Sequence, residues 1–320
     1  MKILIVCSGN PPRNEKFNFF SHHVFIHEQI EQIKSSFNIS FEIYSIKGKG
    51  IFGYLRNIRK LIKTIRVSNP DIIHAHYGTS GLLSIMQFKK PVIITFHGSD
   101  INDFKINILS SISAVFANHN IFVSNKLKDK ILFIRPNFQS VIPCGIDFDT
   151  FFPIDKLSAR QCLNWPLEQK AILFSSAFTN PVKNSQLAKE ALKYVSQETH
   201  FVELKNRTRQ EVNLMLNACD LLLLTSFSEG SPQIIKEAMA TNCPIVATDV
   251  GDVKEVIGDT IACHITTRDP QDIAIKIQQV LGLGTRTNGR DKIIRFNNKI
   301  IALEVFKIYQ TVSQLTFGKR

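Results

Sequence analysis

Short runs of β-branched residues alternate with longer amphipathic segments, and this alternating pattern occurs twice along the chain. It predicts two doubly wound parallel-sheet domains of the α/β class, covering residues 1–150 and 151–297. The segment Arg290–Thr311 has one long helical pattern, and a C-terminal helix of about residues 298–320 is expected to pack back on the first domain. The expected strands are Ile3–Cys7, Phe41–Ile46, Ile72–Ala75, Val92–Phe96 and Asn120–Val123, then Ala171–Ser175, His200–Leu204, Leu221–Thr225, Ile245–Ala247 and Ile261–His264.

Composition excludes several other classes of protein. The 320 residues are 44% hydrophobic and 21% charged, which provides enough apolar material for two cores and argues against disorder. The longest apolar runs are far shorter than the roughly 20 residues that span a bilayer. The N-terminus has too few apolar residues for a signal peptide, so we expect a cytoplasmic protein. The six cysteines form no CxxC pair and predict neither a zinc site nor a disulfide framework.

Positive charge is concentrated in the first half of the chain. The net charge is +12, and residues 1–150 contain 18 Lys and Arg against 10 Asp and Glu. The segment 51–66 predicts one amphipathic helix whose polar face carries five basic residues and no acid. An ordinary helix with a solvated basic face is the favoured interpretation. Contact with anionic lipid at the inner face of the membrane is the alternative. Nucleic acid is not expected as a partner, because no reading motif accompanies the charge. The basic residues of the segment are Arg56, Arg59, Lys60, Lys63 and Arg66.

The loop after the predicted strand Leu221–Thr225 contains the strongest functional signal. Pro232 suits the first turn of a following helix, and Gly230 and Ser231 let the backbone approach a ligand closely. The N–H groups of Ser231, Gln233 and Ile234, together with the helix dipole, suit a phosphate. One of the two carboxylates, Glu229 or Glu237, would hold sugar hydroxyls and the other ribose hydroxyls. The spacing alone favours this interpretation no more than a capped surface helix with incidental acids.

The surrounding motifs resemble those of the retaining glycosyltransferases of family 4, which have the GT-B fold. Seven residues separate Glu229 from Glu237, as in the family signature, and Ala238–Ile257 continues the match. Further similar segments occur in the same order as in the family. These are Ser21–Gln29, Pro70–His76, Thr95–Asp100, Pro143–Asp147 and Lys183–Asn184.

The resemblance implies two Rossmann-like domains facing each other across a cleft. It also implies an enzyme that moves a hexose-type sugar from a nucleotide diphosphate to a glycan or lipid-linked acceptor. The process implied is surface polysaccharide or lipopolysaccharide synthesis. It implies that His97 and Glu229 flank the donor sugar, that Lys183 and Asn184 meet the diphosphate, and that Lys205 and Asn206 lie near the base. Gly230, Ser231, Gln233, Ile234 and Glu237 complete the expected donor site. On the acceptor side we expect Asn10, Arg13 and His76. No metal or cofactor is expected besides the donor.

Two departures from the family pattern stand out. Phe178 occupies a position where family members usually carry an arginine, five residues before Lys183, so one of two expected cations is absent. The loop Gly9–Asn14 contains two prolines in place of a glycine-rich turn.

Three alternative functions remain open at this stage. They are a nucleotide-sugar epimerase of the same fold, a non-catalytic nucleotide-sugar-binding subunit, and a dehydrogenase. The dehydrogenase would use Gly48–Gly53, a literal G-x-G-x-x-G, but this motif follows the second strand instead of the first. Asp147 and Asp149 form a formal D-x-D, yet they lie in the linker pattern and do not predict a metal site.

Overall fold

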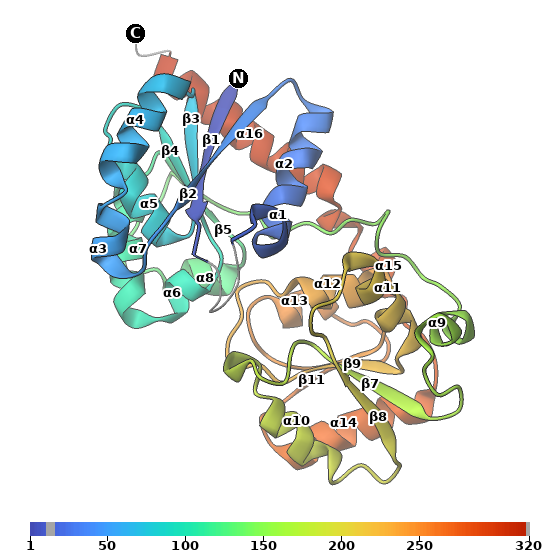
Figure 1. Ribbon diagram of the computed structural model, residues 1–320. Helices are drawn as coiled ribbons and strands as arrows, with labels where there is room; N and C mark the ends of the chain where they lie inside the picture. Colours follow the sequence, from blue (N-terminus) through green and yellow to red (C-terminus); the bar gives the residue numbers. More distant parts are fainter. Residues whose placement is uncertain (11–16, 318–320) are drawn as a thin grey trace. The chain divides into compact units, whose positions relative to one another are not determined.

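A computed structural model describes residues 1–10 and 17–317, and the chain divides into two compact units (Figure 1). Unit 1 comprises Met1–Gly145 together with the segment from Asn298 onward, and unit 2 comprises Ile146–Asn297. Both contain a parallel sheet with helices on each face, which confirms the α/β fold class and the two doubly wound domains.

Unit 1 is built on a six-stranded parallel sheet with the order β2-β1-β3-β4-β5-β6. Alternate residues of β1 pack on opposite faces: Leu4 and Val6 join one apolar cluster, and Ile3 and Ile5 join the other. Strand β1 is therefore buried on both faces, and its residues Ile3–Cys7 form a continuous apolar run. The strands are β1 (Lys2–Ser8), β2 (Ser40–Ile46), β3 (Ile72–His76), β4 (Val92–Phe96), β5 (His119–Phe122) and β6 (Gln139–Val141).

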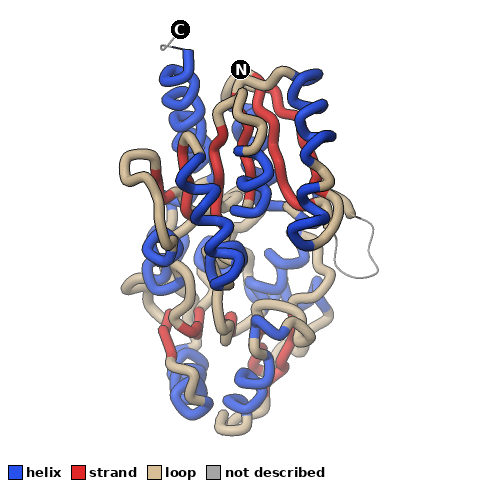
Figure 2. The backbone as a smooth tube through the Cα atoms, turned by 90° about the vertical axis from the view of Figure 1, so that its left-hand side faces the viewer, coloured by secondary structure: helices blue, strands red, loops and turns tan. Residues whose placement is uncertain are grey.

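Two layers of helices cover the sheet of unit 1, and Figure 2 shows its strands lying between them. The C-terminal helix α16 packs beside α2, and its Ile301, Val305 and Tyr309 enter the cluster that contains Ile3. On the other face, α5 packs against α7. The helices are α1 (Phe19–His22), α2 (Val24–Ser36), α3 (Gly50–Leu55), α4 (Ile58–Ser68), α5 (Gly78–Ile85), α6 (Ser99–Asn102), α7 (Phe104–Phe116), α8 (Asn125–Lys130) and α16 (Asn298–Phe317).

Unit 2 has a five-stranded parallel sheet with the order β11-β10-β9-β7-β8. Helices α10 and α14 cover one face, and α11, α12 and α13 cover the other. The strands are β7 (Lys170–Phe174), β8 (Thr199–Glu203), β9 (Leu221–Leu224), β10 (Ile245–Thr248) and β11 (Cys263–Thr266). The helices are α9 (Lys156–Leu163), the 3₁₀ turn η1 (Pro181–Lys183), α10 (Ser185–Leu192), α11 (Arg209–Ala218), α12 (Gln233–Ala240), α13 (Val253–Ile257), α14 (Pro270–Leu283), α15 (Gly289–Lys292) and the 3₁₀ turn η2 (Ile294–Phe296).

The prediction of one helix over 51–66 was wrong, because the structure has α3 and α4 with a break at Asn57. The Asn57 side chain is buried, and its amide donates to the carbonyls of Lys47 at 2.8 Å and Gly53 at 2.7 Å. These bonds compete with continued helical hydrogen bonding and end α3. All five basic side chains of the segment are exposed, while Leu61 and Ile65 of α4 enter the core.

The prediction of one helix over 290–311 was also wrong. The chain leaves helical geometry at Asn297, where ψ is 134°, and Asn297 forms a parallel bridge with Ile146. The amide of Ile146 donates to the carbonyl of Phe296 at 2.8 Å. Strand β6 was not predicted, since three half-buried residues leave no apolar run to detect.

Candidate functional site

The carboxyl ends of β7 and β9 define the point in unit 2 where successive connections leave in opposite directions. Strand β7 lies between β8 and β9, so the chain first crosses to one side of β7 and then to the other. Ligands of doubly wound sheets bind at such a switch point. The loop after β7 contains Lys183 and Asn184, and the loop after β9 contains Glu229 and Gly230.

Lys183 and Glu229 meet at this switch point. The Lys183 Nζ atom lies 2.7 Å from the Glu229 Oε1 atom, and both side chains are largely buried. Ser226 Oγ donates to the same carboxylate oxygen at 2.6 Å. Thr225 Oγ1 donates to the carbonyls of Lys183 and Asn184 at 3.0 and 2.9 Å, which joins the two loops. A cation and a carboxylate are thus held side by side on a rigid base.

The start of α12 presents the backbone expected to face a phosphate. Gln233 and Ile234 form its first turn, and the N-cap residue Pro232 makes no side-chain cap hydrogen bond. The preceding loop packs tightly, because a Cβ atom on Gly251 would lie 2.5 Å from the carbonyl oxygen of Gly230. Gly251 has φ +54°, which a residue with a side chain rarely adopts.

The Ser231 hydroxyl is occupied by a buried ion pair that the sequence did not predict. It donates to Asp252 Oδ2 at 2.5 Å and accepts from Lys236 Nζ. Lys236 Nζ lies 3.3 Å from the same Asp252 oxygen, and the two charged side chains are 0% and 4% exposed. Ser231 therefore offers its backbone, and not its hydroxyl, to a ligand in this arrangement.

Glu237 lies in the second turn of α12 and pairs with Arg209, the first residue of α11. The Arg209 guanidinium also stacks on the ring of Phe151, 4.5 Å from its centroid. Sequence reasoning missed Arg209 because the search for a second cation was confined to the neighbourhood of Lys183. Lys205 and Asn206 are exposed in the turn after β8, where Asn206 has φ +52°.

Phe178 does not stand in the place of a ligand-facing cation. Its ring packs on Phe174 and Phe201 in the apolar cluster between the sheet and α10, with centroid separations of 5.4 and 5.0 Å. Its backbone amide donates to Glu203 Oε2 at 2.5 Å. The substitution for arginine therefore extends the core of unit 2.

In unit 1, His76 and His97 meet at the carboxyl ends of the neighbouring strands β3 and β4. His76 Nδ1 lies 3.0 Å from His97 Nε2, and the rings stack with centroids 5.2 Å apart. Phe25 and Tyr77 contact the His97 ring, each 4.8 Å from its centroid. His74, two residues before His76 in β3, is buried. Its Nδ1 lies 2.7 Å from Tyr309 Oη and its Nε2 lies 2.7 Å from Thr95 Oγ1.

Burial keeps these imidazoles neutral. It lowers the pKa of both His74 and His97 to about 3 and lowers that of His76 well below its ordinary value. The neighbouring histidines add to the depression of the His76 and His97 pKa values. At neutral pH, His97 can exchange hydrogen bonds with a ligand, but it carries no positive charge.

Asp100 positions the turn that contains His97 and the start of α5, which follows His76. Sequence reasoning missed this role. Its Oδ1 accepts from the amides of His97 at 3.1 Å and Gly98 at 2.8 Å, and its Oδ2 accepts from the amide of Gly78 at 2.9 Å. Burial raises the pKa of Asp100, while these backbone donors oppose the rise. The carboxylate thereby ties the turn after β4 to the start of α5.

Asn10 braces the turn after β2. Its side-chain amide donates to the Gly48 carbonyl and accepts from the Gly48 amide, both at 2.8 Å. Gly48 has φ +109° and packs directly on Gly53, which explains the glycines of the G-x-G-x-x-G segment by close backbone contact. Arg13, the other expected residue of this loop, lies outside the described residues.

The D-x-D of the linker has a local role, because Asp147 accepts from the amide of Asp149 at 2.9 Å and from Thr150 Oγ1 at 2.6 Å. Within residues 1–10 and 17–317, no three His, Cys, Asp or Glu side chains gather in a way that could hold a metal ion. In the same part of the chain, no helix is long and apolar enough to cross a membrane.

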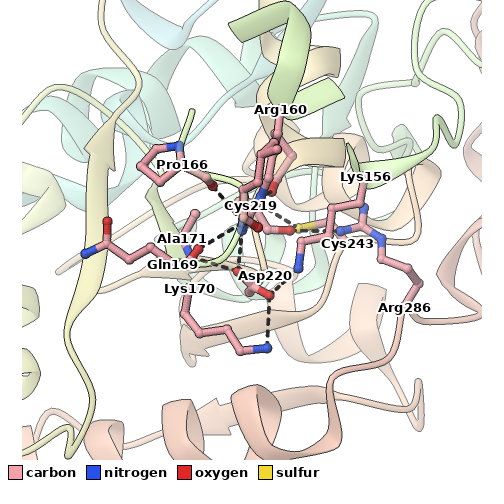
Figure 3. Close-up of polar contacts among 12 residues, drawn as sticks. Lys156, Arg160, Pro166, Gln169, Lys170, Ala171, Cys219, Asp220, Cys243 and Arg286 are labelled. Atoms are coloured by element: carbon pink, nitrogen blue, oxygen red, sulfur yellow. Dashed lines mark hydrogen bonds and ion pairs between the residues drawn. The ribbon is translucent and has the colours of Figure 1, made fainter. Parts of the chain in front are cut away.

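A second buried charge cluster lies at the opposite, amino edge of the unit 2 sheet (Figure 3). Asp220, just before β9, accepts from Arg160 at 2.8 Å, from Lys156 at 2.5 Å and from the amide of Ala171 at 2.7 Å. Arg160 is almost fully buried and also donates to four backbone carbonyls. The cluster fixes α9 to the sheet, away from the switch point.

Two family models match the chain. One, described as Glycosyltransferase Family 4, matches residues 20–150, and the other, Glycosyl transferases group 1, matches residues 179–282. Together they cover more than two thirds of the sequence, in the order in which the two units occur. The chain belongs to the group 1 glycosyltransferases of family 4.

Named relatives agree with this family. A Bacillus subtilis glycosyltransferase named for teichuronic acid biosynthesis, TuaC, is 28% identical over 67% of this chain and 62% of its own length. A Campylobacter jejuni N,N'-diacetylbacillosaminyl-diphospho-undecaprenol alpha-1,3-N-acetylgalactosaminyltransferase is 26% identical over 82% of each chain. The crystal structure of Anabaena HepE in complex with UDP and glucose has a TM-score of 0.76 at 18% identity, covering 97% of this chain and all of that one. It shows a shared GT-B fold.

Proposed function

We propose that this protein is a retaining glycosyltransferase that moves a sugar from a nucleotide diphosphate to a hydroxyl of a glycan or lipid-linked acceptor. The Lys183–Glu229 pair at the switch point of unit 2 carries the proposal. Its two members have opposite chemical preferences. The ammonium group suits a diphosphate, and the carboxylate suits the hydroxyls of a sugar attached to that diphosphate.

The donor would replace protein contacts that are already in place. Its diphosphate takes over Lys183 from Glu229 and accepts from the backbone at the start of α12. Glu229, released from the ammonium, then accepts from sugar hydroxyls. Glu237, oriented by Arg209, accepts from the ribose hydroxyls. The binding groups lie on two loops that hydrogen bonds hold together, so donor binding requires little reorganisation of the protein.

In the proposed reaction, the acceptor oxygen attacks the anomeric carbon on the face from which the diphosphate departs. The bond from the anomeric carbon to the phosphate oxygen breaks, the new glycosidic bond forms, and the acceptor proton passes to the departing phosphate. Lys183 and the α12 dipole stabilise the negative charge that develops on the leaving group, without a metal ion. Neutral His97 positions the acceptor or the sugar by hydrogen bonding.

Binding measurements with a panel of UDP-, GDP-, ADP- and CDP-sugars, with NAD as a control, test the donor site. One nucleotide sugar should raise the melting temperature, and Lys183→Ala or Glu237→Ala should abolish this shift. Release of the nucleoside diphosphate should then require an acceptor. Turnover without acceptor would instead identify an epimerase, binding without turnover a non-catalytic subunit, and a shift with NAD alone a dehydrogenase.

We also propose that the exposed basic face of α3 and α4 contacts anionic lipid at the inner face of the membrane. Its residues Arg56, Arg59, Lys60, Lys63 and Arg66 are all exposed. Each cation near such a surface contributes about 1 kcal/mol. The name of the Campylobacter relative, which specifies a diphospho-undecaprenol substrate, supports a substrate at that surface.

Vesicles containing phosphatidylglycerol should bind the protein at low salt, and Lys60→Glu with Lys63→Glu should abolish this binding. The matched pair Lys193→Glu with Lys276→Glu in unit 2 should leave it unchanged.

A further inference from the structure

Helices α3, α5 and α7 of unit 1 leave an apolar cavity between them. Its volume is about 300 Å³ and it is open to solvent on one side. For comparison, an engineered apolar cavity of about 150 Å³ is large enough to take up benzene. The side chains that form most of its wall are Tyr54, Leu55, Leu82, Met86, Ile106 and Leu109.

The wall of this cavity is only partly covered by the protein itself. Leu82, Ile106 and Leu109 are half-buried and Leu55 is 37% exposed, whereas core residues of the same sheet are almost fully buried. The helices that form the wall also carry Phe52, 81% exposed, and Phe104, 69% exposed. An apolar cavity whose wall stays partly exposed is typical of a site for an apolar ligand.

One end of the cavity lies near the expected acceptor site. Thr79, in the first turn of α5, lines it and lies three residues after His76 in the chain. Gly50, at the start of α3, also lines it and stands two residues from Gly48, which Asn10 braces. A Cβ atom on Gly50 would meet no neighbour, so this end is open. A ligand in the cavity would therefore extend its head toward the carboxyl ends of β1 and β3.

The charge around the cavity specifies the head group of that ligand. Lys49 is exposed directly before Gly50, and Arg56 is exposed directly after Leu55. Lys105 is exposed next to Ile106 on the opposite wall. Between Glu42 and Asp71 the sequence has no acid to neutralise this side. An apolar cavity with cations at its edge fits a hydrocarbon chain that ends in an anion.

We infer that the cavity binds the first part of the single hydrocarbon chain of a lipid diphosphate, the carrier of the acceptor sugar. The inference rests on the proposed function, since the carrier is an acceptor of that reaction. A single chain is the occupant because a cavity of about 300 Å³ accommodates part of one hydrocarbon chain, whereas a two-chain phospholipid would leave its second chain exposed. The diphosphate lies at the cations, and the sugar lies at the carboxyl edge of the sheet.

Calorimetric titration of the full chain with farnesyl diphosphate tests this inference, with inorganic diphosphate as the head group alone. Farnesyl diphosphate should bind at least about tenfold more tightly, because burial of two methylene groups accounts for that factor. Leu82→Trp, which fills the cavity, and Leu55→Gln, at its rim, should each remove most of this advantage. Neither should change the affinity for inorganic diphosphate. Ile275→Trp, at an exposed position in unit 2, is the matched control.

Equal affinities for the two diphosphates would overturn the inference, as would a preference for farnesyl diphosphate that survives both variants. Leu55→Gln keeps the test valid if the larger Leu82→Trp fails to fold. If Leu82→Trp instead weakens binding to phosphatidylglycerol vesicles while farnesyl diphosphate does not bind, the occupant is a bilayer acyl chain and the inference is wrong. Donor binding is measured on the same proteins. If the wild-type protein binds a nucleotide sugar but shows no preference for farnesyl diphosphate, this inference alone is wrong. If the wild-type protein binds none of the nucleotide sugars, the proposed function is wrong.

Discussion

Lys183 Nζ and Glu229 Oε1 lie 2.7 Å apart, although 45 residues separate them in the chain. They face each other because η1 follows β7 and the glycine-containing loop follows β9, and these strands are adjacent in the sheet. The cation of the proposed donor site is thus ion-paired with a carboxylate of the same site. Donor binding must exchange one partner for the other, which makes the energetics of this pair measurable.

Replacing Lys183 by Met should weaken binding of the preferred nucleoside diphosphate by about tenfold to a hundredfold, since a charge-assisted hydrogen bond contributes roughly 1.5–3 kcal/mol. Calorimetric titration measures this change. Lys193→Met, which removes an exposed lysine of the same unit, is the control and should have no effect. Unchanged affinity in Lys183→Met would place the diphosphate elsewhere.

Replacing Asp100 by Asn should lower kcat far more than it raises the donor KM. The variant weakens the three backbone bonds that hold the His97 turn against α5, and all three bonds lie within unit 1. Steady-state kinetics should show a fall in kcat of about tenfold or more, as expected when positioning is lost. A variant that changes only the donor KM would contradict this positioning role.

The stability of the protein should fall as the pH drops below about 6.5. Burial lowers the pKa of His74 and His97 to about 3, so the unfolded chain binds protons that the native chain does not. Their contribution is complete above the unfolded pKa and is lost as the pH falls toward 3, by up to about 1.4 kcal/mol per histidine and pH unit. Urea unfolding at several pH values should show a shallower decline in His74→Gln. Wild type and variant should show no pH-dependent difference between pH 7.5 and 8.5; parallel declines below pH 6.5 would contradict the assignment.

Replacing Asp220 by Ala should destabilise the protein by about 3–5 kcal/mol, because it leaves the buried Arg160 guanidinium without its carboxylate. Burial alone would raise the pKa of Asp220. Hydrogen bonds from Lys156 and the Ala171 amide, with the charges of Lys156 and Lys170, outweigh that effect and lower it. Asp259→Ala breaks an exposed pair with Lys292 and should have little effect on stability. Similar losses in urea unfolding of the two variants would contradict the structural importance of the buried cluster.

Replacing Lys236 by Met should destabilise unit 2 by leaving Asp252 as an unpaired buried carboxylate, at a cost of about 3 kcal/mol or more. The double variant with Asp252→Leu should recover much of that loss, since no buried charge then remains. Urea unfolding of the two single variants and the double variant completes the thermodynamic cycle. Additive losses would show that the two side chains are energetically independent.

Sequence alone determined the features that depend on local pattern. All ten predicted strands occur, and the clearest of them, such as β1 and β9, are buried on both faces and therefore form continuous apolar runs. The segment from Ser226 to Glu237 was predicted to lead from a strand into a helix, because Gly230 and Pro232 have strong local preferences. The family motifs pointed to the same loop as the site.

Only the tertiary structure decided which side chains meet. Arg209 pairs with Glu237, and Asp100 joins two loops, through contacts between residues distant in sequence. Side-chain hydrogen bonds of Asn57 and the bridge between Asn297 and Ile146 interrupt the two predicted helices, and helical periodicity does not report either contact. The cavity beside α5 and the neutral state of His97 depend on how completely neighbouring elements exclude water. Hydrophobic periodicity indicates which side chains are buried. The partner of a side chain, the shape of a cavity and the local dielectric around a titratable group depend on the assembled tertiary structure.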